Sequence, residues 1–221
     1  WISEAAHRGV VAFDTETNSL DATQAMMIGL SMAIEPGRAC YVPLRHGTSG
    51  QGSLLSEVAP APVQIPFDAA LARLKPLLEN PGVLKIGHNI KYDTLVMQQP
   101  GNGGVRITPV DDTMCLSYVM EGGMHGHGLD ELSQLHFNHT NIKYGEVCGK
   151  GKAQIPFAEV PLERARDYAA EDADMTLRLH RRLKPELPKV GMATVYETLE
   201  RPLIPVLAMM ENNGIKVDPA I

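Results

Sequence analysis

Three short segments of this sequence carry carboxylates at spacings that suit the binding of metal ions. Asp14 and Glu16 stand two residues apart in FDTET, at the end of an apolar, β-branched run, so strand alternation points both side chains to the same side. Asp93 lies in GHNIKYD, where a buried strand gives way to a helix. In YAAED, Tyr168 and Asp172 are four residues apart and share one face of a helix. The three segments could therefore aim acidic groups at one place.

Each segment also has an ordinary structural explanation. An acidic pair at a strand end is common on the solvated turns of an acidic protein. A carboxylate such as Asp93, in a first helical turn, interacts favourably with the helix dipole. Helix faces often carry pairs such as Tyr168 and Asp172. Glu171 and Asp174 flank the last of these, and we interpret them as a solvated acidic face rather than as ligands.

The convergence of three segments favours a metal centre. Four carboxylates held close together raise one another's pKa unless cations balance them, and oxygen ligands suit Mg²⁺ or Mn²⁺. Two such ions about 4 Å apart can bind a scissile phosphate, generate hydroxide and stabilise a leaving 3′ oxygen. We therefore expect a two-metal site for phosphodiester hydrolysis, with Tyr168 orienting the attacking water.

The elements that must position these groups alternate between strand and helix. Three apolar segments near the N-terminus predict a meander of strands: 10–14, 25–34 and 39–44. Residues 48–66 are rich in Gly, Ser, Pro and Gln and predict a solvated loop. Later segments predict strands 83–87 and 105–112 and helices 67–79, 89–99, 112–120, 128–137, 162–183 and 194–214. This order predicts an α/β fold in which helices cover a sheet.

Bulk composition limits the alternatives. With 221 residues, 44% of them hydrophobic, the chain can bury one good core. The sequence has no long uncharged apolar run and no basic stretch before an apolar one, so we expect a cytoplasmic protein without membrane span or signal peptide. Cys40, Cys115 and Cys148 are far apart and lack CxxC spacing, which argues against a disulfide framework or a thiolate zinc site. The net charge of −6 argues against a non-specific nucleic-acid binder, unless divalent ions balance the four carboxylates.

Two other patterns in the sequence could suggest a binding site. Four histidines fall within fifteen residues: His125, His127, His136 and His139. Two of them lie in a Gly-rich loop and neither cysteine nor carboxylate completes a recognised spacing, so we do not expect zinc. The CGKGK segment lacks the residue order of a phosphate loop. Its Lys150 and Lys152 either contact a nucleic acid or lie on a solvated loop, and both interpretations stay open.

The three acidic segments, in this order, resemble a known family. FDTETNSLD, GHNIKYD and YAAEDADMTLRLH are similar to the exonuclease motifs of bacterial family A polymerases, in the DEDD exonuclease superfamily. The similarity continues through DDTMCLSYVM, GLDELSQLHFNHTNIKYGEVCGKGKAQIPF and LERPLIPVLAMMENNGIKVDP, and so covers essentially the whole chain. It implies an RNase H-like fold with a central mixed β-sheet flanked by α-helices.

The resemblance implies a 3′ to 5′ proofreading DNA exonuclease that releases nucleoside 5′-monophosphates. It implies that two divalent ions, Mg²⁺ or Mn²⁺, are held by Asp14, Glu16, Asp93 and Asp172. Tyr168 would position the nucleophilic water, as in the tyrosine subclass of the superfamily rather than the histidine one.

The resemblance also implies contacts with the DNA, from Leu20, Asn89, Lys91, Tyr92 and Tyr144. Leu20 would wedge against the terminal base, and Tyr144 would stack on a base whatever its identity. One departure is His88, where the best-known relatives have glutamine before the asparagine. Both side chains hydrogen-bond, so we expect little change in mechanism, but a pH dependence stays open.

The implied partners are a single-stranded or frayed DNA 3′ end and a covalently linked polymerase domain. We expect residues 1–193 to form the exonuclease domain and residues 194–221 to begin the polymerase domain, so that this chain is a piece of a longer protein. We expect a monomer without membrane contact. Two alternatives remain: an RNA 3′ trimming exonuclease with the same chemistry, and a catalytically silent domain that supports a polymerase, against which the complete set of acids argues.

Overall fold

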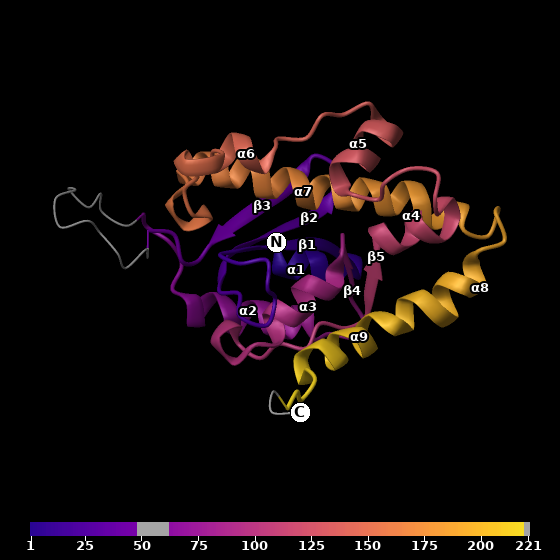
Figure 1. Cartoon of the computed structure of the whole chain (residues 1–221), viewed down its shortest axis with the longest axis horizontal. Coiled ribbons are helices and arrows are strands. Elements are labelled where there is room, and N and C mark those ends of the chain that lie inside the picture. The colour runs from indigo at the N-terminus through magenta and orange to yellow at the C-terminus, as the bar shows by residue number, and fades with distance from the viewer. Residues whose placement is uncertain (48–61, 219–221) are drawn as a thin grey trace.

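The computed structural model describes residues 1–47 and 62–218 and centres on a mixed five-stranded sheet in the order β3-β2-β1-β4-β5 (Figure 1). The strands are β1 (Val10–Thr17), β2 (Met27–Glu35), β3 (Arg38–Pro43), β4 (Leu84–Gly87) and β5 (Val110–Asp112). The first three form the predicted antiparallel meander, whereas β4 and β5 add in parallel. The predicted mixed sheet is therefore confirmed.

Helices cover both faces of this sheet. One face is covered by α1 (Ile2–Arg8), α2 (Phe67–Leu78), α3 (Ile90–Gln98) and α9 (Arg201–Asn213). The other is covered by α7 (Leu162–Leu183), against which α4 (Thr113–Glu121), α5 (Leu129–Phe137) and α6 (Tyr144–Val147) pack (Figure 1). None of the helices within the described ranges combines the length and apolarity that a bilayer crossing needs.

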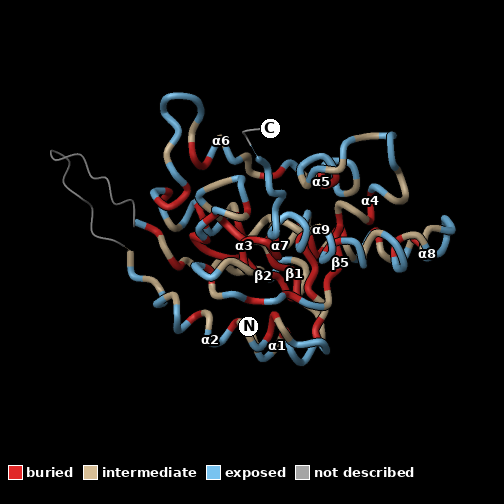
Figure 2. The backbone as a smooth tube through the Cα atoms, turned by 60° about the horizontal axis from the view of Figure 1, so that its bottom comes forward, coloured by how far each residue is buried: buried red, intermediate tan, exposed pale blue. Residues whose placement is uncertain are grey.

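Alternation along β1 divides the core between these two faces. Val11 and Phe13 pack with the helices of the first face, whereas Ala12 packs with α7. Because the strand period is two, Asp14 and Glu16 continue the side of Ala12. Figure 2 shows that buried residues concentrate in the central strands and on the helix surfaces turned toward them. The end of β1 thus presents its acids to α7.

The longest helix, α7, has the bounds that the sequence predicts, directly after Pro161. Ala165, Ala169 and Ala173 recur every four residues and are completely buried, so they form one stripe of small side chains toward the sheet. Tyr168 and Asp172 each precede one of these alanines. The stripe that seats the helix on the sheet therefore also brings Tyr168 and Asp172 to the end of β1.

The fifth strand is shorter than predicted, since its ladder begins at Val110 rather than at residue 105. Val105 N–H donates to the Met97 carbonyl of α3 (2.8 Å), and Thr108 N–H donates to the Leu78 carbonyl of α2 (3.2 Å). Pro109 has no N–H to donate to a ladder. Residues 105–109 therefore bind to helix ends instead of extending the sheet.

The C-terminal helix is present but not uniform. It runs as α8 (Ala193–Val195), a π turn (Tyr196–Glu200) and α9. Pro202 cannot donate an N–H to the Thr198 carbonyl, so the regular i to i−4 ladder is broken there. The helix ends before Gly214 (φ 65°), as predicted. Most of the predicted loop 48–66 and the last three residues of the chain lie outside the described residues.

Candidate active site

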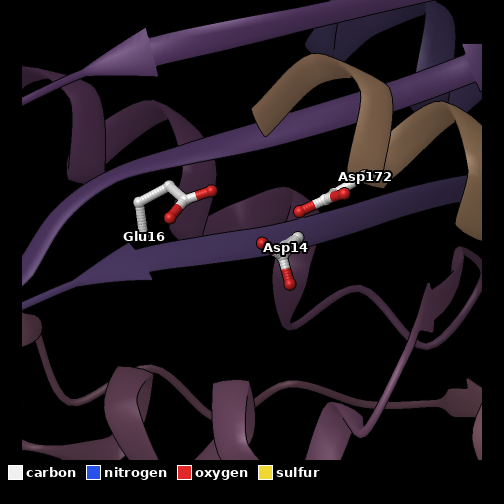
Figure 3. Close-up of side chains that lie close together, drawn as sticks. All are labelled: Asp14, Glu16 and Asp172. Atoms are coloured by element: carbon white, nitrogen blue, oxygen red, sulfur yellow. The ribbon is translucent and has the colours of Figure 1, made fainter. Parts of the chain in front are cut away.

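Asp14, Glu16 and Asp172 bring their carboxylates together at the end of β1 (Figure 3). One oxygen of each lies within 4.8 Å of the other two. Asp14 and Glu16 extend from β1, and Asp172 reaches them from α7. In the described part of the chain, this is the one group of three or more potential ligands from His, Cys, Asp and Glu with such spacing.

Asp93 approaches the same place from the opposite face of the sheet. Thr15 points away from its two acidic neighbours and toward α3. Oδ1 of Asp93 accepts hydrogen bonds from the Thr15 N–H (3.0 Å) and from the Thr15 hydroxyl (2.6 Å). Asp93 is only 2% exposed and lines the same cavity as the other acids. The fourth predicted acid thus stands beside the three-carboxylate cluster, held by Thr15, rather than within it.

The four acids line an open cavity of about 610 Å³. Its walls come from the end of β1 and the loop after it, from the starts of α3 and α5, from α6 and the segment after it, and from the first half of α7. Of the predicted DNA contacts, Leu20, Asn89, Tyr92 and Tyr144 line this cavity, as does Tyr168. Among the described residues that line it, none is lysine or arginine.

Burial raises the pKa of every acid in this site. For Asp14 it raises the pKa to about 7, although the Thr15 backbone hydrogen bond lowers it. Burial, and then the charges of Asp14 and Asp172, raise the pKa of Glu16. Burial, and then the charge of Asp14, raise the pKa of Asp93 and of Asp172. The carboxylates therefore need positive charge to ionise together.

The residues present fit divalent cations. Oε1 of Glu16 is buried and has no hydrogen-bond partner among the described residues. The cluster offers only carboxylate oxygens, and the described lining of the cavity holds no lysine or arginine to balance them. Such a set of oxygen donors matches the ligands that Mg²⁺ and Mn²⁺ prefer. Such ions would supply the charge that lets these acids stay ionised.

Tyr168 stands in an aromatic wall beside this cluster. Its ring centroid lies 6.2 Å from that of Tyr144 and 6.0 Å from that of Phe157, and Tyr144 stacks on Phe157 at 6.4 Å with an angle of 16° between the rings. Burial, and then the charge of Asp172, raise the pKa of Tyr168, so its hydroxyl stays protonated. Tyr144 is 42% exposed and lines the cavity.

The loop after β1 carries Leu20, which is 97% exposed, at the rim of the cavity. This loop is fixed by Tyr92, whose hydroxyl donates to the Ser19 carbonyl (2.5 Å) and lies 2.5 Å from the Thr17 hydroxyl. The sequence predicts Tyr92 as a DNA contact. The structure adds that Tyr92 lines the cavity and that its hydroxyl already has partners in the protein.

The start of α3 places two further side chains at the cavity. Asn89 adopts a left-handed conformation (φ 61°) directly before the helix. His88 lines the cavity with Nδ1 2.8 Å from the Thr113 hydroxyl, and burial lowers its pKa to about 4. Lys91, predicted as a DNA contact, does not line the cavity but forms an ion pair with Glu211 of α9.

The interpretation of Glu171 and Asp174 as a solvated acidic face is wrong. Glu171 accepts hydrogen bonds from His139 Nε2 (2.8 Å) and Ile142 N–H (2.7 Å), and Asp174 accepts one from Gly37 N–H (2.7 Å). Their side chains are only 18% and 16% exposed. They hold the segment after α5 and the β2–β3 turn against α7.

Lys150 and Lys152 belong to the segment after α6, whose Gln154 lines the cavity. The stem of Lys150 lies against Gly145, where an added Cβ would come 2.5 Å from Lys150 Cε. Within the described ranges neither lysine forms an ion pair. This segment therefore holds unpaired positive charge beside Tyr144, at the rim of an acidic cavity.

Comparison with known proteins adds independent findings. Residues 1–188 match a protein family described as 3′-5′ exonuclease. DNA polymerase I of Rhizobium leguminosarum is 50% identical over 230 residues, which cover 100% of this chain and 22% of that protein. DNA polymerase I of Pseudomonas aeruginosa is 40% identical over 219 residues, which cover 99% of this chain and 23% of that protein. The chain thus spans less than a quarter of the length of these curated relatives.

A solved structure supports the fold. Brucella melitensis NrnC with bound Mg²⁺ superposes with a TM-score of 0.68 at 21% sequence identity, covering 93% of this chain and 86% of that one. At this identity the similarity concerns the fold, and it agrees with the mixed sheet flanked by helices.

Proposed function

This chain belongs to the 3′-5′ exonuclease domains of DNA polymerase I, and from that premise we propose that it removes nucleotides singly from frayed or single-stranded DNA 3′ ends with two divalent ions. The observation that supports the ions most directly is the cluster of Asp14, Glu16 and Asp172, with its unpartnered Glu16 oxygen. In the relatives the match covers under a quarter of a longer protein, so we propose that a polymerase domain is covalently attached in the intact protein.

The placement of the acids supports the roles that we propose for them. We propose that Asp14, Glu16 and Asp172 are ligands, and that Asp93 serves as a ligand from the other face of the sheet. Divalent ions bound here would activate a water molecule and neutralise charge on the scissile phosphate. The Tyr168 hydroxyl stays protonated beside Asp172, so it can orient the attacking water by hydrogen bonding.

The shape of the rim supports the substrate contacts that we propose. A completely exposed leucine side chain, Leu20, suits insertion beside a terminal base, and the ring of Tyr144 offers a stacking surface that every base can use. Asn89 and Tyr92 line the wall between them. Lys91 can contact the strand only if it leaves Glu211, so it is the weakest of the proposed contacts.

We keep residues 1–193 as the exonuclease domain and 194–221 as the start of the polymerase domain, and we expect a monomer. DNA is favoured over RNA because the most similar curated relatives are DNA polymerases. A silent domain is disfavoured because all four acids and Tyr168 line one cavity.

The test is degradation of a 5′-labelled single-stranded DNA in Mg²⁺ or Mn²⁺, compared with an RNA of the same sequence. We expect a ladder that shrinks from the 3′ end of the DNA, and that chelation abolishes. An Asp14→Ala, Glu16→Ala double variant should form no ladder, while Asp68→Ala, which changes an exposed acid of α2, should match the original protein. Faster degradation of the RNA would indicate that RNA, and not DNA, is the substrate. No ladder with either ion would indicate a silent domain.

A further inference from the structure

The helix that follows α7 packs against the elements that carry the active-site residues. The family match ends at residue 188, yet three residues beyond it are buried in the exonuclease core. Tyr196 and Ala208 are 0% exposed and Ile204 is 4% exposed. Ile204 and Ala208 pack on the face of the sheet that α1, α2 and α3 cover. Tyr196 packs on the other face with α4, α5 and the end of α7. Residues 193–213 therefore pack against the exonuclease core, although from residue 194 on we assign them to the start of the polymerase domain.

Tyr196 has a buried hydroxyl with two partners at the end of β5. The hydroxyl accepts the N–H of Asp112 (2.9 Å) and donates to Oδ1 of Asp111 (3.1 Å). Asp111 is itself 0% exposed and pairs with His180 (2.7 Å) and Lys184 (3.0 Å) of the α7 C-terminal region. The phenol is thus held between two successive residues, one of which is anchored by ion pairs.

The carboxylate of Asp112 caps two helices at once. Oδ1 accepts hydrogen bonds from the N–H groups of Met114 (2.8 Å) and Cys115 (3.2 Å) at the start of α4, and from Asn89 N–H (3.1 Å). Oδ2 accepts from Ile90 N–H (2.8 Å) at the start of α3. Asp112 is 2% exposed. It supplies acceptors to N–H groups that a helix start leaves without intrahelical partners.

These bonds determine where α3 begins. Asn89 has a φ of 61°, a left-handed conformation that asparagine tolerates better than most residues, and its backbone N–H is held there by Asp112. Asn89 lines the cavity, and Asp93 follows one helical turn later. A shift of Asp112 would therefore move both a proposed DNA contact and a proposed ligand.

We propose that Tyr196 is a positioning residue for the exonuclease reaction, because its hydroxyl fixes Asp112, which fixes the start of α3 and with it Asn89 and Asp93. The inference rests on the proposed function. According to this inference, the segment beyond the family match helps to fix the geometry of the site through the hydroxyl group of Tyr196.

The test uses the whole 221-residue chain with Tyr196→Phe, which keeps the ring and removes only the hydroxyl. Displacing a reacting group by a fraction of an ångström is costly, so we expect kcat for removal of a 3′ nucleotide to fall about tenfold. Ile204→Val is the matched control, since Ile204 lies on the same C-terminal helix, is buried and has no side-chain group that could hydrogen-bond to Asp112. It should lower the unfolding temperature by at least as much and leave kcat unchanged.

Amide hydrogen exchange gives a readout that does not need activity. The amides of Asn89 and Ile90 should exchange faster in Tyr196→Phe than in Ile204→Val, because their shared acceptor has lost its anchor. The loss of activity caused by Asn89→Ala should also be smaller in the Tyr196→Phe variant than in the original protein. Equal exchange and equal kcat in the two variants would overturn the inference. If the original protein cleaves no DNA, the proposed function fails instead, and amide exchange alone decides the role of Tyr196.

Discussion

Thr15 and Asp93 are joined by two hydrogen bonds across 78 residues of sequence, from the Thr15 backbone N–H (3.0 Å) and hydroxyl (2.6 Å) to the same carboxylate oxygen. Thr15 sits between Asp14 and Glu16 but points to the other face of β1. The strand thus supplies two acids on one side and the anchor of another acid on the opposite side.

Removal of the Thr15 hydroxyl should loosen Asp93 without changing any acid. For Thr15→Val, an isosteric change in a strand, we expect about 1 kcal/mol lower unfolding free energy, the usual loss for one hydrogen bond. We expect kcat to fall about fivefold, since a small displacement of a proposed ligand is costly. Thr94→Val is the control, because the buried Thr94 hydroxyl has no partner among the described residues. Equal kcat in both variants would contradict the anchoring role.

Without divalent ions, the stability of the protein should decrease as pH rises. Burial raises the pKa of Asp14 from 3.8 to about 7, so the folded protein holds a proton that the unfolded chain releases. The stabilisation is complete below about pH 4 and is lost as pH rises to about 7. Thermal unfolding in a chelator should show this decline, with a smaller one in Asp14→Asn. Added Mg²⁺ should restore stability at pH 8, and a flat metal-free profile would count against the buried acid cluster.

Titration of His88 should not contribute to the pH profile of kcat. Burial lowers the pKa of His88 to about 4, so the imidazole is neutral throughout the range from pH 6 to 9. Glutamine can keep a hydrogen bond to Thr113. His88→Gln should therefore leave the shape of the pH profile of kcat unchanged. An inflection between pH 6 and 7 that disappears in the variant would show that His88 titrates in the active protein.

Lys150 and Lys152 should contribute to the salt dependence of substrate binding. If each contacts one phosphate of a single strand, replacing both with glutamine should reduce the slope of log Kd against log salt by about 1.4. The binding measurement uses single-stranded DNA with Ca²⁺ in place of Mg²⁺. An Arg73→Gln, Arg106→Gln variant changes the charge equally on exposed residues of the opposite face. If both variants give the same slope, the lysines belong to a solvated loop.

Some of this architecture follows from local sequence rules. The bounds of α7 could be predicted because Pro161 starts the helix and alanines recur every four residues on its buried stripe. Asp14 and Glu16 could be placed on one side because a strand has a period of two. These features depend on neighbours within a few residues, which the sequence displays directly.

Other features depend on contacts between distant segments. Asp93 has the spacing of a helix-start acid, and only its bond to Thr15 shows from which face it arrives. The pairing of Lys91 with Glu211 spans 120 residues, so no local pattern predicts it. Glu171 looked solvated because the segments that bind it, around His139 and Ile142, follow a different helix. The double capping by Asp112 was missed for the same reason, although its position directly before a helix was a signal for one cap.

With no lysine or arginine in the described lining of the cavity, the proposed binding of substrate and the proposed binding of ions should be thermodynamically linked. A phosphodiester strand that enters alone meets several carboxylates, and a strand that enters after the ions meets their positive charge. Linkage requires reciprocity, so the factor by which ions strengthen binding of the strand equals the factor by which the strand strengthens binding of the ions. Under the proposed function the domain would therefore be a cooperative receptor for two unlike ligands, and its occupancy by nucleic acid would vary with the supply of divalent cations.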